Sequence, residues 1–293
     1  MNEIVINYHI NSQCNYHCTH CFSKWENKDS SHELHLNIKH VEIMLSDVYN
    51  FFKTNSHQQL NIADRNDKIR LNIVGGEPLL LKNFGDIVAI ANKIGYNIGI
   101  VTNGSLIDET FIRSYSQYLS IIGLSIDATD KTIMRQVGRS TKTGNVVNLK
   151  KLISHINMAR KMNSDIKIKV NTVVNQSNVN HHIGHFIQNI SPDKWKILKV
   201  LPLFTSTNAV TDEQFEFFIN NHQQYKNVMS VEKNNDMIAS YIMIDPFGRF
   251  FDNSMWERSN QYIYSDPIMD TGAANAFRQI QFDIQKFDQR YST

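Results

Sequence analysis

The sequence predicts an α/β fold in which six strands alternate with helices and form an open, partial barrel. Two observations predict this fold. First, six short segments along the chain are rich in aliphatic residues. Second, the longer segments between them carry apolar residues that recur with helical spacing. This alternation is typical of parallel strands that are joined by right-handed helical crossovers. Six strands are too few to close the eight-stranded barrel of this class, so we expect an incomplete one.

The expected strands and helices follow one another in regular order. The strands cover residues 4–9, 68–74, 97–102, 121–126, 167–174 and 195–201. The helices between them cover residues 36–53, 80–94, 108–119, 146–162 and 179–190. In the first helix, Val41, Leu45 and Val48 recur at a spacing that places them on one buried face. The second strand ends at Gly75-Gly76 and the third at Asn103-Gly104, and both are turn-forming sequences.

The last third of the chain has a less regular pattern. We expect a helix over residues 212–222, a hairpin turn over 245–248 and a terminal helix from about residue 270. No long linker divides the chain, which contains only five Pro. The expected organisation is therefore a barrel core over residues 1–205 and a C-terminal extension over 206–293 that packs on the barrel in the same globular unit.

The composition excludes several classes of protein. Thirty Lys and Arg against 28 Asp and Glu give a formal net charge of +2, which does not favour broad attraction to nucleic acids or to a membrane surface. No apolar run approaches the roughly 18 residues that cross a bilayer. The first residues, MNEIVI, do not resemble a secretory signal. We therefore expect a cytoplasmic monomer that binds neither membranes nor nucleic acids directly.

The three cysteines carry the strongest chemical signal. Cys14, Cys18 and Cys21 lie within eight residues, and the rest of the chain has none. An odd number in so short a segment does not suit a disulfide framework. Three closely spaced thiolates instead suit a 4Fe–4S cluster with one iron open to a small molecule, since closed clusters usually take four cysteines.

Two other interpretations of the cysteines stay open. His9, His17 or His20 could complete a structural zinc site with three Cys and one His. The three thiols could also be unrelated buried residues, although their confinement to one short segment disfavours this interpretation.

Polar and apolar residues alternate along several of the expected strands. The polar faces carry Asn7, His9, Lys68, Arg70, Asn72, Lys167, Lys169, Asn171, Lys194 and Lys196. Because unpaired cations are costly inside a barrel, we expect these faces to line a lumen that holds water and an anionic ligand, of which phosphates are the best match. The alternative is a set of antiparallel strands with one face in water, which the intervening helices disfavour.

Short polar loops follow several strands, at the end where α/β barrels place their active sites. Gly75 and Gly76 would let the backbone turn sharply and approach a ligand closely. Ser125 and Asp127 come at the end of the fourth strand. Each residue alone has a structural explanation, and Asp127 could simply cap a helix. Their joint placement indicates a ligand site.

These motifs together resemble the radical S-adenosylmethionine (SAM) superfamily. The resemblance rests on residues 14–22, CNYHCTHCF, and on Gly75-Gly76-Glu77-Pro78. More narrowly, the chain resembles viperin and its prokaryotic relatives over about residues 4–288. Further matching segments are Asn7-Tyr8-His9, Asn103-Gly104-Ser105-Leu106-Ile107, Val137-Gly138-Arg139, Lys169-Val170-Asn171, Trp195-Lys196, Ser240-Tyr241 and Arg249-Phe250.

The resemblance implies a reaction. In this family one 4Fe–4S cluster binds SAM, and an external donor resembling flavodoxin or ferredoxin supplies electrons. The adenosyl radical removes hydrogen from C4′ of a nucleoside triphosphate, and the 3′-hydroxyl leaves as water. The 3′-deoxy-3′,4′-didehydro product terminates viral RNA synthesis, which in bacteria would serve defence against phages.

The resemblance also implies roles for individual residues. It assigns the cluster to Cys14, Cys18 and Cys21. It assigns SAM to Gly76, Glu77, Asn103, Ser125 and Arg139. It assigns the nucleoside triphosphate to Asn7, Arg70, Asn72, Lys169, Asn171, Lys194 and Lys196. Tyr241 matches a proposed hydrogen donor of the last step, although a buried tyrosine with a bonded hydroxyl is an equal alternative.

The sequence is also compatible with two other functions. One is a different radical SAM enzyme, such as a peptide-modifying maturase, although these often carry further cysteines near the C-terminus. The other is a zinc-binding module without catalytic activity, which leaves the cationic strand faces unexplained. The base of the nucleotide is not readable among CTP, UTP and GTP, and a pyrimidine is favoured.

Overall fold

The computed structural model describes residues 3–25, 29–54, 68–202, 208–255 and 261–291. These residues form two compact units, each assembled from separate stretches of the chain. The first unit comprises Met1–Gln13, Ser23–Gly99 and Asp236–Thr293, and the second comprises Cys14–Phe22 and Ile100–Asn235. The expected boundary at residue 205 lies outside the described residues, so the division into core and extension stays a prediction.

The sheet of the first unit is parallel in its centre and antiparallel at its edge. Strand β1 (Ile4–His9) pairs in parallel with β2 (Ile69–Val74) along its whole length, from Ile4↔Ile69 to His9↔Val74. On its other side β1 pairs in parallel with β8 (Ile242–Ile244). The antiparallel strands β9 (Arg249–Asp252) and β10 (Ile263–Pro267) follow β8. The turn between β8 and β9 confirms the expected hairpin.

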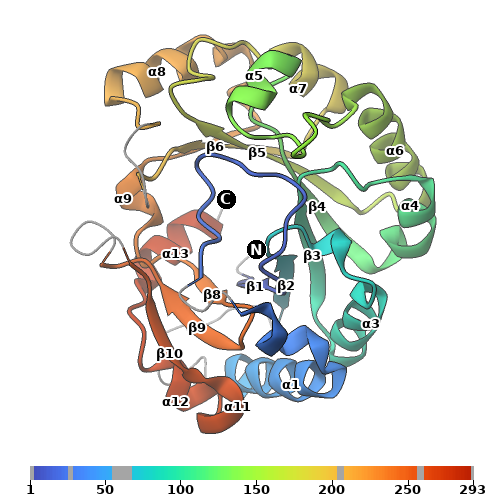
Figure 1. Cartoon of the computed structure of the whole chain (residues 1–293), viewed down its shortest axis with the longest axis vertical. Helices are drawn as coiled ribbons and strands as arrows, with labels where there is room; N and C mark the ends of the chain where they lie inside the picture. Colours follow the sequence, from blue (N-terminus) through green and yellow to red (C-terminus); the bar gives the residue numbers. More distant parts are fainter. Residues whose placement is uncertain (1–2, 26–28, 55–67, 203–207, 256–260, 292–293) are drawn as a thin grey trace. The chain divides into compact units, whose positions relative to one another are not determined.

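Helices α1 (Ile38–Thr54) and α3 (Phe84–Ile94) pack together in this unit (Figure 1). Helix α1 buries Val41, Leu45 and Val48, as its spacing predicts. The prediction of one terminal helix from about residue 270 is wrong. Three short helices stand there instead, α11 (Ile268–Thr271), α12 (Ala273–Phe277) and α13 (Ile284–Tyr291), because Gly272 at φ 77° breaks the first from the second.

The second unit contains four parallel strands in the order β4-β5-β6-β7. They are β4 (Leu119–Ser125), β5 (Lys167–Val174), β6 (Lys194–Lys199) and β7 (Met229–Glu232). Strand β3 (Asn97–Thr102) has residues in both units. The parallel pairing rules out the antiparallel alternative for these strands. The sequence did not predict β7, which is only four residues long.

Helices connect the parallel strands of the second unit. They are α4 (Glu109–Tyr115), α5 (Lys131–Gln136), α6 (Leu149–Met162), α7 (Gly184–Ile190) and α8 (Asp212–Asn220). Figure 1 shows α4, α6 and α7 in a row beside the strands. Along β5 the residues Ile168, Val170 and Thr172 are buried. Lys169 and Asn171 lie on the opposite face, which leaves this polar face for a ligand.

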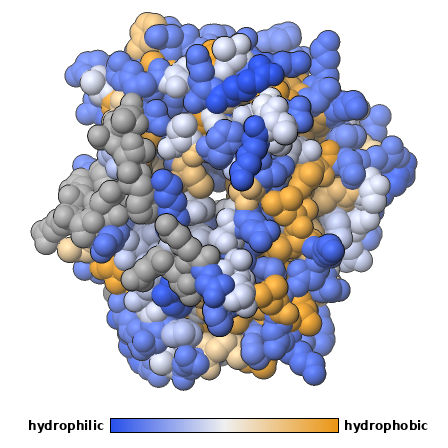
Figure 2. All heavy atoms as spheres, in the orientation of Figure 1, coloured by the Kyte–Doolittle hydropathy of each residue, from blue (hydrophilic) through white to orange (hydrophobic). Residues whose placement is uncertain are grey.

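Hydrophilic side chains cover most of the described surface on the face in Figure 2, and hydrophobic residues are exposed there in patches between them. Among the described residues, no helix is long and apolar enough to cross a membrane.

Candidate functional site

The cysteine loop of the second unit is held by backbone contacts that need no metal. The amide of His17 donates to the carbonyl of Gly138 at 3.2 Å, and the amide of Thr19 donates to the carbonyl of Val137 at 3.1 Å. Gly138 has φ 77°, and a Cβ there would come within 2.4 Å of the His17 carbonyl oxygen. Glycine is therefore required at position 138, where the backbone packs against the cysteine loop.

Asn103 fixes the beginning of the same loop. Its Nδ2 donates to Oδ1 of Asn15 at 2.8 Å, and Nδ2 of Asn15 donates to Oγ of Ser105 at 2.9 Å. The amide of Ser105 donates back to Oδ1 of Asn103 at 2.9 Å. Asn103 is thus buried and structurally engaged at the end of β3, directly beside the cysteine loop.

Asp127 lies after β4 in the centre of this arrangement, and its carboxylate is completely buried. Its Oδ2 is 2.6 Å from Nε of Arg139 and 3.2 Å from Nε2 of His20. Burial alone raises the pKa of this carboxyl, but Arg139 and His20 outweigh it and hold the pKa below its ordinary value. Asp127 is therefore ionised. It caps no helix, because Asp130 is the N-cap of α5.

Two rows of residues cross strands β4, β5 and β6. In one row Gly123 pairs with Lys169 and Lys169 with Lys194. In the next row Ser125 pairs with Asn171 and Asn171 with Lys196. Residues paired across parallel strands, and residues two apart along one strand, share a face. The structure thus brings Ser125, Lys169, Asn171, Lys194 and Lys196 together on one face, which we call the lysine face.

The lysine face contains a carboxylate that sequence reasoning missed. Glu232 at the end of β7 forms a buried ion pair with Nζ of Lys196. Asn171 lies next to Lys196, and its buried Oδ1 has no hydrogen-bond partner among the described residues. A buried polar atom without a partner is unusual, and on this face it indicates the place of a polar ligand.

In the first unit, the Gly75-Gly76-Glu77 segment runs against the residues that lead into the cysteine loop. The amide of Gly76 donates to the carbonyl of Asn11 at 2.8 Å, and the amide of Glu77 donates to the carbonyl of Gln13 at 2.8 Å. A Cβ on Gly76 would come within 2.0 Å of the Gln13 carbonyl oxygen. Only glycine therefore fits at position 76, and Glu77 is buried beside it.

The polar residues of β1 and β2 also lie together in the first unit. Asn7 pairs with Asn72 in the register, and Nδ2 of Asn72 donates to Oδ1 of Asn7 at 3.0 Å. Arg70, two residues before Asn72, places Nη1 2.9 Å from Oε2 of Glu3. The buried Nε of Arg70 has no partner among the described residues. Glu3 is a second carboxylate that sequence reasoning did not connect with the site.

Tyr241 immediately precedes β8 and is covered by α13. The guanidinium carbon of Arg290 lies 3.8 Å from the centroid of the Tyr241 ring, and Nη2 of Arg290 donates to Oγ of Ser240 at 2.9 Å. The next residue, Tyr291, places its ring centroid 6.0 Å from the guanidinium of Arg70. Nothing in the sequence pattern indicated that α13 would reach these residues.

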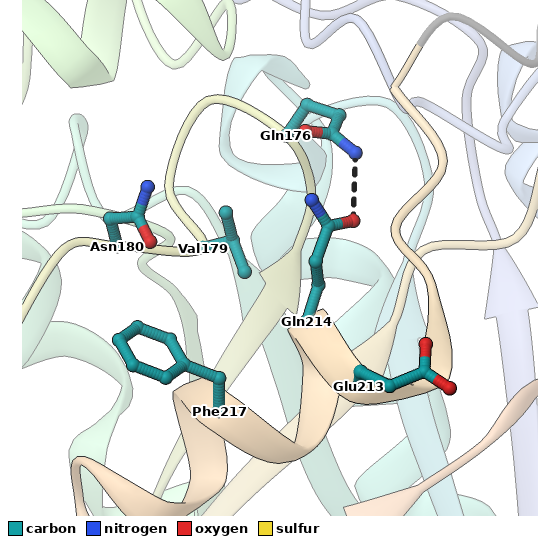
Figure 3. A pocket seen from close by; sticks show the side chains of 6 residues that line it. All are labelled: Gln176, Val179, Asn180, Glu213, Gln214 and Phe217. Atoms are coloured by element: carbon teal, nitrogen blue, oxygen red, sulfur yellow. Dashed lines mark hydrogen bonds between the residues drawn. The ribbon is translucent and has the colours of Figure 1, made fainter.

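A separate pocket of about 330 Å³ lies between the loop after β5 and helix α8 in the second unit (Figure 3). Its lining consists of Gln176, Val179, Asn180, Glu213, Gln214 and Phe217. A hydrogen bond of 2.9 Å joins Gln176 Nε2 to Gln214 Oε1 across it. The lining holds one carboxylate and no cation, so this pocket does not suit a phosphate.

The radical SAM superfamily model matches residues 8–190. The chain belongs to the radical SAM superfamily. It is 37% identical over 290 residues to a protein of Psychrobacter lutiphocae named S-adenosylmethionine-dependent nucleotide dehydratase, covering 99% of this chain and 95% of that one. A protein of Pseudoalteromonas ulvae with the same name is 33% identical, covering 99% of this chain and 94% of its own. This radical SAM protein therefore belongs to the same family as these relatives.

Solved structures agree with this fold. The structure described as native anSMEcpe with bound AdoMet (SAM) superposes with a TM-score of 0.66 at 15% identity, covering 99% of this chain and 83% of that one. Streptococcus suis SuiB bound to S-adenosylmethionine gives 0.63 at 12% identity, covering 99% and 68%. Together with the family match, these likenesses confirm the predicted α/β radical SAM fold.

The cysteine loop fits the cluster that this superfamily implies. None of the three cysteines forms a disulfide, and Cys14 is exposed while Cys18 and Cys21 are partly exposed. Three thiols in one loop, held by backbone contacts, are the donor set that an open 4Fe–4S cluster needs. Among the described residues, no group of three or more His, Cys, Asp and Glu, the three cysteines included, stands in a preformed metal site, so the fit to a cluster rests on the chemistry of the thiols. Nε2 of His20, a candidate fourth ligand of a zinc site, lies 3.2 Å from Oδ2 of Asp127.

The expected SAM and substrate residues form two groups, one in each unit. The first unit brings Asn7, Arg70, Asn72 and Tyr241 onto β1, β2 and the start of β8, with Gly76 and Glu77 after β2. The second unit brings Asn103 and Arg139 against the cysteine loop, and Ser125 onto the lysine face. The ligands of these residues stay predictions.

Proposed function

We propose that this radical SAM protein is an enzyme that dehydrates a nucleoside triphosphate to its 3′-deoxy-3′,4′-didehydro analogue. The relatives named nucleotide dehydratase cover nearly the whole chain, which supports a nucleotide substrate. The observation that carries the proposal is the lysine face, where three cations and an unpartnered amide oxygen share one side of β5 and β6. Clustered cations suit a triphosphate better than an uncharged peptide.

Lys169, Lys194 and Lys196 would bind the phosphates. Their ammonium groups act as point charges with freely rotating donors, so they can follow the three phosphates without fixed geometry. Arg70 can form a bidentate contact with one phosphate when its Nη1 separates from Oε2 of Glu3. Asn7, Asn72 and Asn171 would donate to or accept from the sugar and base.

Gly76, Glu77, Asn103, Ser125 and Arg139 would bind SAM. The bare backbone at Gly76 allows close approach to the SAM amino group, and Arg139 suits the SAM carboxylate. When bound, the cluster and SAM would supply the radical that removes hydrogen from C4′; loss of the 3′-hydroxyl as water, with one further electron and one proton, completes the product.

Tyr241 would supply this last electron and proton together as one hydrogen atom, so that the 3′-hydroxyl leaves as water, and the external electron donor would then reduce the tyrosyl radical. Its ring is held by Arg290, which fixes its orientation. The electrons would come from an external protein such as flavodoxin or ferredoxin. The three thiols must stay reduced to bind a cluster, so we propose a cytoplasmic location. The product lacks a 3′-hydroxyl and would terminate RNA chains, which suits defence against phages, and we favour a pyrimidine base.

The test is an anaerobic assay of the reconstituted, reduced enzyme with SAM and with CTP, UTP, GTP or ATP in turn. We expect one nucleotide to stimulate release of 5′-deoxyadenosine and to yield a product lighter by one water. Cleavage of SAM that ignores every nucleotide would contradict the proposal and favour another radical SAM reaction.

A pair of lysine variants tests the substrate site. Lys169→Met removes a cation from the lysine face, and we expect KM for the nucleotide to rise about tenfold, as loss of one charge-assisted contact predicts. Lys93→Met is the matched control, because Lys93 lies on helix α3 rather than on the lysine face, is exposed and pairs with Glu42 at 3.0 Å. Equal effects in both variants would argue against a phosphate site on this face.

A further inference from the structure

The buried Asp127 carboxylate joins three parts of the second unit. Its Oδ2 contacts Nε of Arg139 at 2.6 Å and Nε2 of His20 at 3.2 Å, while its Oδ1 accepts from the amide of Val173 at 2.8 Å. His20 stands between Cys18 and Cys21 in the cysteine loop. One carboxylate thus contacts the cysteine loop, the segment that follows α5 and strand β5.

The position of Asp127 is itself fixed. Oγ1 of Thr172 donates to the carbonyl of Ile126 at 2.7 Å, and Nδ2 of Asn178 donates to the carbonyl of Asp127 at 2.9 Å. The carboxylate is therefore a rigid reference point. Because it is anchored to the strands, it can set the positions of the two side chains that it contacts.

The contact with Asp127 occupies only the Nε side of the Arg139 guanidinium. Asp127 takes Nε, and the two Nη groups of Arg139 have no hydrogen-bond partner among the described residues. A guanidinium held at Nε still presents the pair of Nη donors, which matches a carboxylate in a bidentate contact. The charge of Asp127 also makes burial of Arg139 tolerable before any ligand binds.

We infer that Asp127 is a positioning residue, which aims the Nη edge of Arg139 at the SAM carboxylate and locks the cysteine loop through His20. This inference rests on the proposed role of Arg139 in binding SAM. It assigns Asp127 no contact with SAM itself. It implies that iron loading of the loop and SAM affinity depend on the same carboxylate.

The test compares Asp127→Asn with Asp130→Asn. Asp130 is exposed and caps α5 only three residues away, and Asn also caps helices well, so the control removes one nearby carboxylate without touching Arg139. Three quantities are measured anaerobically: iron and sulfide per chain after reconstitution, the Kd of SAM, and the change in the cluster's electron paramagnetic resonance spectrum on adding SAM.

We expect Asp127→Asn to weaken SAM binding about 10- to 100-fold, as loss of a supporting partner does at metal sites, and to lower iron content. KM for SAM should rise while KM for the nucleotide stays within about twofold of wild type. Asp130→Asn should match wild type in all three quantities. Wild-type SAM affinity, spectrum and iron content in Asp127→Asn would overturn the inference.

Two further variants keep the outcome unambiguous. Asp127→Glu retains the buried charge, so it should fold even where Asp127→Asn does not, but its longer side chain misplaces Arg139 and should still weaken SAM binding. If both are insoluble, Asp127 serves folding and the inference fails. Arg139→Met separates the two proposals: normal SAM binding in it refutes the role of Arg139, whereas lost binding there with normal binding in the Asp127 variants refutes this inference alone.

Discussion

Two glutamates each form an ion pair with one cation of the expected substrate site, and so neutralise its charge. Glu232 pairs with Lys196 in the second unit, and Glu3 pairs with Arg70 in the first. A buried cation without a partner is costly, so each glutamate stabilises the protein before substrate arrives. A triphosphate must then compete with the glutamate for its cation.

Replacing Glu232 tests this competition. In Glu232→Gln, Lys196 loses its counter-charge, so we expect KM for the nucleotide to fall about fivefold, equivalent to about 1 kcal/mol, and the midpoint of thermal unfolding to drop. Glu216→Gln is the control, because Glu216 pairs with Lys233 at 2.8 Å but both are about half exposed. A raised KM in Glu232→Gln would mean that Glu232 itself helps to bind the nucleotide.

Gly138 shows how one residue holds the cysteine loop. In Gly138→Ala, the new Cβ meets the backbone of His17 and Cys18, so we expect destabilisation on the order of 3 kcal/mol and poor iron loading. Gly144→Ala has a similar φ of 81°, yet its nearest neighbour is 3.6 Å away, so it should cost only about 1 kcal/mol and load iron normally. Unfolding of the metal-free variants and iron content measure both effects; equal losses would show that only φ matters.

At the scale of elements, the sequence predicted what depends on local periodicity. Strands 97–102 and 167–174 were predicted with the same bounds that the structure shows. Both segments are rich in β-branched and aliphatic residues, and turn-forming residues flank them. The lysine face followed from the alternation of polar and apolar residues along the expected strands. Strand β7 was missed, since four residues carry too little periodicity, and Glu232 was missed with it. The contact of α13 with Tyr241 depends on tertiary packing, which no local pattern encodes.

Helix α13 gives a prediction at this scale. Arg290→Gln removes the cation over the Tyr241 ring while leaving Phe287, the buried anchor of the helix. If Tyr241 gives the last hydrogen, we expect 5′-deoxyadenosine still to form while the yield of dehydrated nucleotide per SAM cleaved falls severalfold. Arg278→Gln is the control, because the Arg278 side chain is exposed and, among the described residues, hydrogen-bonds only to Asn275. An unchanged product ratio in Arg290→Gln would show that α13 does not position Tyr241.

On the scale of the whole molecule, buried histidines set the acid stability of both units. Burial lowers the pKa of His9 to about 3, and its ring lies 5.0 Å from that of Trp25 and 5.4 Å from that of Phe251 in the first unit. Burial likewise lowers the pKa of His222 in the second unit. Both residues must stay neutral for the units to remain folded.

Because burial lowers the pKa of both histidines, the free energy of unfolding falls as the pH falls. Unfolded His9 gains a proton below pH 6.5 while folded His9 stays neutral to about pH 3, so its contribution is complete above pH 6.5 and is lost as pH falls. At pH 5.0 the loss amounts to about 2 kcal/mol for His9 alone. The low pKa of Asp127 acts only below about pH 4, since its unfolded value lies there, so the histidines dominate between pH 7.5 and 5.0.

Denaturant unfolding of the metal-free protein at pH 7.5 and 5.0 measures this loss. The difference between the two free energies of unfolding should be about 2 kcal/mol smaller in His9→Phe than in wild type, whatever the absolute stability of the variant. His40→Gln, which changes an exposed histidine of α1, should leave the difference unchanged. If His9→Phe loses as much stability on acidification as wild type, then His9 is protonated in the folded protein. The acid sensitivity would then originate in the second unit, where His222→Phe offers the same comparison.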